Sequence, residues 1–125
     1  MNRVWLIGRL TQDPDLRLTP DGTAVTRFTL AVDRRPGPDG QRTADFIDCV
    51  AWRKLAEIVA DHLRKGRLVA VQGRLQIRTY ETQDGQKRRA AEVVAETVEF
   101  LPDGRKASSD AAGAEAEAEP ESVPF

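Results

Sequence analysis

Apolar and polar residues alternate along most of the first hundred positions of the chain. In residues 3–10, for example, Leu6 and Leu10 share one face, while Trp5 and Ile7 point the other way. A period of two is typical of a strand whose two faces meet different surroundings. The same period recurs further along and predicts five strands in all, at residues 3–10, 24–34, 44–52, 67–80 and 90–101.

Between the third and fourth of these strands, the period lengthens to that of a helix. In residues 53–66, Leu55, Val59 and Leu63 recur on one helical stripe. Gly66 then follows basic residues, as at a helix C-terminus. The order of three strands, one helix and two strands is that of the OB-fold. We therefore expect an all-β domain, a five-stranded OB-fold barrel with one helix between strands 3 and 4.

The segments between the predicted strands carry turn residues. The stretch "DPDLRLTPDGT" at 13–23 contains Pro-Asp-Gly and is interpreted as a connection. "RPGPDGQRT" at 35–43 is rich in proline and glycine and predicts a loop, and Asp84-Gly85 predicts the turn between the last two strands. Alternation also assigns Phe28 and Phe100 to the core.

The composition changes near Pro102. Residues 1–102 hold 17 Lys and Arg against 14 Asp and Glu, a net of +3, whereas the rest holds 2 against 6, a net of -4; together they give the chain's net charge of -1. A segment so poor in apolar side chains cannot offset the entropy lost on ordering, so we expect it to be disordered. The predicted organisation is a domain at 1–102, a flexible linker at 103–114 and an acidic tail at 115–125.

Several classes of function are disfavoured by what the sequence lacks. No run approaches the roughly 20 apolar residues of a membrane span, and Arg9 interrupts the apolar start, so we expect a cytoplasmic protein without a membrane anchor. The single cysteine, Cys49, and the single histidine, His62, form no zinc-binding pattern. We expect no metal, no cofactor and no catalytic centre, since no nucleophile with an acid–base partner is present.

Two predicted strands carry aromatic and basic side chains on the face opposite the core. In the third strand this outward face holds Phe46, Asp48, Val50 and Trp52, and the core face holds Ile47, Cys49 and Ala51. In the fourth strand the outward face holds Arg74, Gln76, Arg78 and Tyr80, and the core face holds Val71, Leu75 and Ile77.

A face of this kind is suited to single-stranded nucleic acid. Any base can stack on an aromatic ring, for about 1–3 kcal/mol, and the phosphates between bases need cations. An alternative is that Phe46 or Trp52 caps the barrel or packs at a subunit contact. An RNA-binding module of the same fold is a further alternative, because stacking does not by itself reject a 2′-hydroxyl.

Long stretches of the chain resemble the bacterial single-stranded-DNA-binding protein family. The similarity covers "NRVWLIGRLTQDPDLRLTPDGTAVTRFTLAV", "ADFIDCVAWRKLAEIVADHLRKG", "VQGRL" and "QDGQKRRAAEVVAETVEFL", and includes the acidic end that closes on Pro-Phe. The resemblance implies a homotetramer of OB-fold subunits that coats single-stranded DNA without sequence preference. It also implies a nucleoid-associated protein whose tail recruits replication, recombination and repair proteins.

The resemblance assigns roles to particular residues. Phe46, Trp52 and Tyr80 match the base-stacking aromatics, and the nearby cations assigned to phosphate are Arg53, Lys54, Arg74, Arg78, Lys87 and Arg88. The family often has a further stacking aromatic after the second strand, but "DRRPGPDGQR" has none. Arg34 and Arg35 are the candidates to stack a guanidinium plane or bind phosphate there.

The acidic tail and Trp5 can each be interpreted in two ways. The tail residues Glu119, Glu121, Val123, Pro124 and Phe125 match the family's partner-docking end, although a solubilising appendage would have a similar composition. The acidic residues alternate with alanine instead of forming a block, so we expect weaker partner binding than is usual. The outward Trp5 is assigned to a subunit contact, with the DNA face as the alternative.

Overall fold

The computed structural model describes residues 1–102 of the chain, so the expected linker at 103–114 and acidic tail at 115–125 lie outside the described residues. The described part contains one helix and six strands: β1 (Val4–Leu10), β2 (Asp15–Leu18), β3 (Ala24–Asp33), β4 (Ala44–Trp52), α1 (Arg53–His62), β5 (Leu68–Glu81) and β6 (Lys87–Phe100). None of its helices is long and apolar enough to cross a membrane.

Five of the strands close into a ring. Their order is β1-β5-β6-β4-β3, and pairing of β1 with β3 closes it. All pairs are antiparallel except β4 with β6, which run parallel. α1 packs against β3 and β4 and is tied to β3 by the Thr26 hydroxyl, which donates to the Ala56 carbonyl at 2.8 Å. The expected five-stranded barrel, with its helix between the third and fourth ring strands, is confirmed.

The short strand β2 was not predicted. Residues 13–23 were expected to be a connection, but Asp15–Leu18 pairs with the outer edge of β3. All four side chains of β2 are exposed. Its residues, Asp-Leu-Arg-Leu, do alternate between polar and apolar, but the run is short and stands among turn residues, which favoured a connection. The Pro-Asp-Gly turn that follows is present, with Gly22 at a φ of 89°.

The core lies inside the ring and under α1. It includes Phe28, Cys49, Ala51 and Val71, as the alternation predicted, together with Leu30. Ile47 and Phe100 are partly buried against it. Burial in this apolar setting raises the pKa of the Cys49 thiol to about 12, so the thiol stays protonated at neutral pH.

The second half of β5 does not belong to the core. Leu75 and Ile77 were expected to be buried, but they are 41% and 51% exposed. β5 pairs with β1 only up to Gly73, and beyond this residue β6 is its sole partner strand in the described structure. Within residues 1–102 no third strand pairs with β5 in this segment, so the alternation there does not mark a buried face.

The opposite correction applies to Val50. It was placed on the outward face of β4 but is only 1% exposed. Arg27 lies opposite Val50 on β3, and Val94 lies opposite it on β6. A sheet position flanked by strands on both sides is shielded by its neighbours' side chains, even on the outer face.

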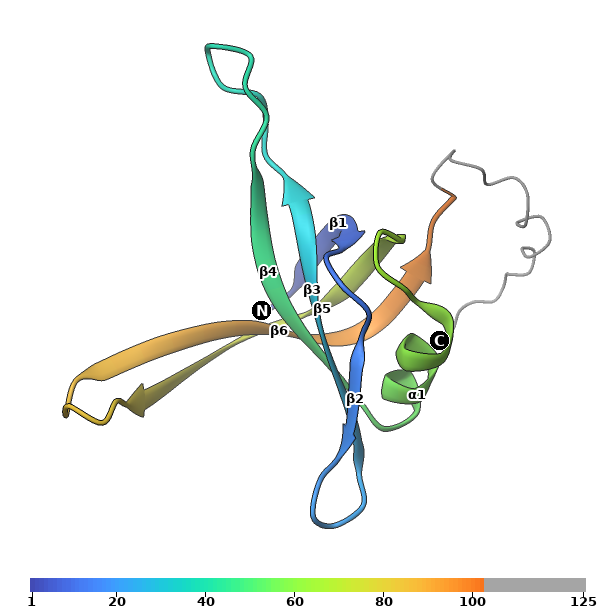
Figure 1. Cartoon of the computed structure of the whole chain (residues 1–125), viewed down its shortest axis with the longest axis vertical. Coiled ribbons are helices and arrows are strands. Elements are labelled where there is room, and N and C mark those ends of the chain that lie inside the picture. The colour runs from blue at the N-terminus through green and yellow to red at the C-terminus, as the bar shows by residue number, and fades with distance from the viewer. Residues whose placement is uncertain (103–125) are drawn as a thin grey trace.

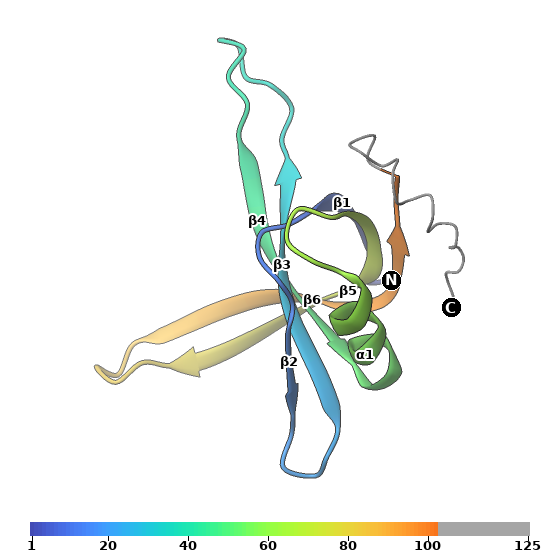
Figure 2. The same ribbon diagram turned by 45° about the vertical axis from the view of Figure 1, so that its right-hand side comes forward.

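Three arms extend from the ring, as Figures 1 and 2 both show. They are the loop at 34–43 between β3 and β4, the β2–β3 hairpin with its turn at 19–23, and the β5–β6 hairpin with its turn at 82–86. In this last turn Gly85 has a φ of 86°, as expected for the Asp84-Gly85 turn.

Candidate nucleic-acid interface

Two aromatic rings lie on the outer face of β4. Phe46 is 70% exposed and Trp52 is 39% exposed, and their even spacing along the strand places them on the same side. Asp48 and Val50 lie between them on this face; Val50 is buried and Asp48 is exposed, and both rings remain accessible. The 70% exposure of Phe46 does not fit the alternative that this ring caps the barrel of the subunit.

Trp52 lies in a hollow with two of the predicted cations. It ends β4 immediately before α1, and the hollow has a volume of about 700 Å³. Its lining residues are Thr19, Pro20, Asp21, Thr23, Trp52, Arg53, Arg74 and Gln76. The fold therefore brings an aromatic ring into the same hollow as the guanidinium groups of Arg53 and Arg74. Among the other lining residues, the Thr19 hydroxyl donates a hydrogen bond to Asp21 and lowers the pKa of that carboxyl.

Tyr80 lies on the β5–β6 arm together with three further predicted cations, Arg78, Lys87 and Arg88. Tyr80 is 47% exposed and is in register with Arg88 on the neighbouring strand. Lys87 lies opposite Glu81, and Arg88 Nη2 donates to Gln86 Oε1 at 3.1 Å. The arm thus carries an aromatic side chain with cations beside it. Figures 1 and 2 show that the arm extends away from the closed barrel of strands.

The remaining predicted cations are more dispersed. Arg34, at the start of the β3–β4 loop, has Nη2 2.7 Å from Asp45 Oδ1. The hydrogen bond to that carboxylate raises the pKa of Arg34 and occupies part of its guanidinium. Arg35 is exposed on the same loop, and Lys54 is exposed on the first turn of α1. These residues do not line the hollow at Trp52, nor the second hollow described in the next paragraph.

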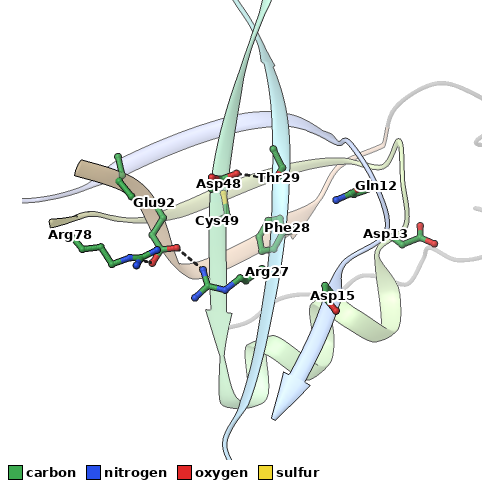
Figure 3. Close-up of a pocket in the computed structure, with 12 residues that line it drawn as sticks. Gln12, Asp13, Asp15, Arg27, Phe28, Thr29, Asp48, Cys49, Arg78 and Glu92 are labelled. Atoms are coloured by element: carbon green, nitrogen blue, oxygen red, sulfur yellow. Dashed lines mark hydrogen bonds and ion pairs between the residues drawn. The ribbon is translucent and has the colours of Figure 1, made fainter. Parts of the chain in front are cut away.

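A second hollow, of about 290 Å³, lies between β2, β3, β4 and β6 (Figure 3). It contains an ion-paired cluster in which Arg27 and Arg78 approach Glu92 from opposite sides. Arg27 Nη1 lies 2.8 Å from Glu92 Oε2, whereas Arg78 Nε lies 3.9 Å from Glu92 Oε1. Nearby, the Thr29 hydroxyl donates to Asp48 Oδ1 at 3.1 Å.

Sequence reasoning missed Arg27 and Glu92 as residues of this face. The alternation does put Arg27 opposite the buried Phe28, so its outward direction was visible. Its partner is 65 positions away, on β6, and only the closure of the ring brings the two together. No local spacing in the sequence marks such a pair.

The face as a whole can hold planar rings and neutralise anions. Its exposed rings come from β4 and β5, and its cations come from β3, α1, β5 and β6. Within residues 1–102 no group of three or more His, Cys, Asp or Glu is arranged to hold a metal ion. The exposed rings can stack with planar groups, and the cations can neutralise anions.

Comparison with known proteins agrees with this geometry. Residues 1–101 match the model of the single-strand binding protein family. The chain is 61% identical over 102 residues to the single-stranded DNA-binding protein of Bacillus cereus, an alignment that covers 81% of this chain and 60% of that protein. It is 55% identical over 114 residues to the protein of the same name from Clostridium tetani, covering 90% and 79%.

A third relative is the single-stranded DNA-binding protein A of Bacillus subtilis, which is 58% identical over 102 residues, covering 81% of this chain and 59% of that protein. The chain thus matches about 60% of the length of the Bacillus relatives. The names of these three proteins describe binding to single-stranded DNA.

Proposed function

The chain belongs to the single-strand binding protein family, and from this premise we propose that it binds single-stranded DNA without sequence preference. The observation that carries the proposal is the set of three exposed aromatic side chains on one continuous sheet, Phe46, Trp52 and Tyr80, of which Trp52 and Tyr80 have cations beside them. Large aromatic rings exposed in this way indicate a binding surface.

The proposed mode of binding follows from the chemistry of the face. Bases stack on the three rings, because every base has a π-face whatever its hydrogen-bonding edge. Phosphates between the bases meet the guanidinium and ammonium groups of Arg53, Arg74, Arg78 and Arg88, with Arg34, Arg35, Lys54 and Lys87 at the margins. Such contacts read the backbone and the ring faces, so they hold many sequences equally.

A competition between nucleic acids tests this proposal. We expect single-stranded DNA to bind far more tightly than a duplex of equal length, because paired bases hide their faces from stacking. The affinity should fall with salt, with a log–log slope of roughly -0.7 per neutralised phosphate. Fluorescence titration at stated salt concentrations measures both quantities. Preference for duplex would refute the proposal, and preference for RNA of the same sequence would favour the RNA-binding alternative.

We further propose that the protein assembles as a homotetramer. Trp5 and Ile7 on β1 are 67% and 59% exposed, and Leu75 and Ile77 on β5 are also uncovered. Trp5 and Ile7 lie on the outer face of the ring, and Leu75 and Ile77 lie on the other face of β5, beyond its pairing with β1. Exposed apolar side chains of this kind favour burial against other copies. Multi-angle light scattering should give about four subunits. A stable monomer at micromolar concentration would contradict this assembly and return Trp5 to the DNA face as a candidate.

The segment with Glu119, Glu121, Val123, Pro124 and Phe125 is proposed to dock onto replication, recombination and repair proteins. Phe125 would enter an apolar pocket of the partner, where burial of the ring is worth about 1.5–3 kcal/mol. Deleting residues 123–125 should therefore abolish capture of such a partner in pull-downs, while titrations with single-stranded DNA stay unchanged or tighten slightly at low salt. Unchanged capture would leave the solubilising role as the better explanation.

A further inference from the structure

Glu92 is a buried acidic residue on a face that we propose to bind phosphates. Its side chain is only 10% exposed, and its two carboxylate oxygens face Arg27 and Arg78. A carboxylate withdrawn from water is costly unless a cation accompanies it. The two arginines are therefore the counter-ions of Glu92. An arginine that is paired with Glu92 is less available to bind nucleic-acid phosphate.

The two arginines hold Glu92 in different ways. β4 lies between β3 and β6 in the sheet, so the Arg27 side chain crosses β4 to reach Glu92. It forms a hydrogen-bonded ion pair there, with 2.8 Å between Nη1 and Oε2. Arg78 remains at 3.9 Å, beyond hydrogen-bonding distance, and its side chain is 55% exposed.

We propose that Glu92 is an internal counter-ion that competes with nucleic-acid phosphate for Arg78, while Arg27 stays bonded to Glu92 throughout. When phosphate binds Arg78, it replaces the long Arg78–Glu92 ion pair and leaves the Arg27–Glu92 hydrogen bond intact. Because Arg27 remains in place, the buried carboxylate is never left without a cation when Arg78 turns to the ligand. This inference rests on the proposed binding of single-stranded DNA and concerns how strongly one position of the face holds it.

We therefore expect the wild-type protein to bind the phosphate at Arg78 more weakly than an unpaired arginine would. Replacing Glu92 by glutamine keeps the side chain's size and a hydrogen-bond acceptor for Arg27, but removes the competing charge. E92Q should therefore bind single-stranded DNA more tightly at low salt and show a log–log salt slope steeper by up to about 0.7, the value for one further phosphate. A slope steeper by 0.7 means that, when salt is diluted tenfold, the affinity of E92Q rises roughly 5-fold more than that of the wild type.

The matched control is Glu57→Gln. Glu57 is exposed on α1 and lines neither hollow, and its replacement changes the net charge of the chain by the same amount. E57Q should leave the salt slope unchanged. A gain in E57Q equal to that in E92Q would show a general charge effect and overturn the proposal, as would an unchanged or weaker affinity in folded E92Q.

A second measurement is the salt slope of Arg78→Gln in both backgrounds. This change leaves the Arg27–Glu92 pair intact. The slope should fall by well under 0.7 in the wild type, where Glu92 already occupies Arg78, and by about 0.7 in E92Q. Equal losses in both backgrounds would overturn the proposal. If E92Q fails to fold, a full loss of 0.7 in the single variant R78Q would overturn it alone.

Failure of this inference is distinguishable from failure of the proposed function. If wild-type protein does not bind single-stranded DNA, or prefers duplex, the function itself is refuted. If wild-type protein binds and loss of the Trp52 ring weakens binding, while E92Q and R78Q behave as independent surface charges, only the role of Glu92 is refuted.

Discussion

Replacing Trp52 by alanine is expected to weaken binding to single-stranded DNA by about 5- to 150-fold in Kd. The range corresponds to the loss of about 1–3 kcal/mol when one base loses its stacking partner. Trp52 should show the largest effect of the three aromatic residues. The same hollow also holds Arg53 and Arg74, so loss of the ring disturbs stacking beside two cations that we propose to bind phosphate. Fluorescence titration with a mixed-sequence strand at fixed salt measures the change.

The conservative variants provide the control for this prediction. Trp52→Phe and Tyr80→Phe keep an aromatic ring at each position, so they should retain most of the affinity. Tyr80→Ala should lose affinity as Trp52→Ala does, because its ring is exposed on the β5–β6 arm. If both alanine variants remain folded and bind as tightly as the wild type, the proposed face is the wrong one.

Gly73→Ala is expected to give a large loss of stability. A Cβ atom at Gly73 would lie 2.1 Å from the Val94 carbonyl oxygen and 3.0 Å from the Ala95 Cα, so the backbone of β6 would have to move. The register between β5 and β6 shifts at Gln72 and Gly73, where β5 leaves the ring and begins the arm. Forced overpacking of this kind costs typically about 1–3 kcal/mol.

Chemical denaturation at one fixed protein concentration measures this loss, since assembly would make the apparent stability depend on concentration. Gly37→Ala is the matched control. Its added Cβ would meet a side-chain oxygen of Asp39 at 3.3 Å, in a loop where the neighbour can move. G37A should stay within about 0.5 kcal/mol of the wild type. Equal stability of G73A and the wild type would show that β6 yields at this point without cost.

The sequence alone determined the elements that have a strong local signal. Period-two alternation located the five ring strands, and the stripe through Leu55, Val59 and Leu63 located α1. Successive side chains of a strand point to opposite faces, so the alternation along β4 and β5 was enough to place Phe46, Trp52 and Tyr80 on the outward face. The turn at Asp84-Gly85 was equally visible, since a left-handed φ favours glycine.

Tertiary structure decided everything that depends on which strands become neighbours. Leu75 and Ile77 alternate like core residues, but they are exposed because β5 leaves the ring after Gly73. Val50 is buried on the outer face because strands flank it on both sides. Glu92 meets Arg27 only because β4 and β6 pair in parallel and close the ring. Burial and ion pairing are properties of spatial neighbours, and those neighbours lie far apart in the chain.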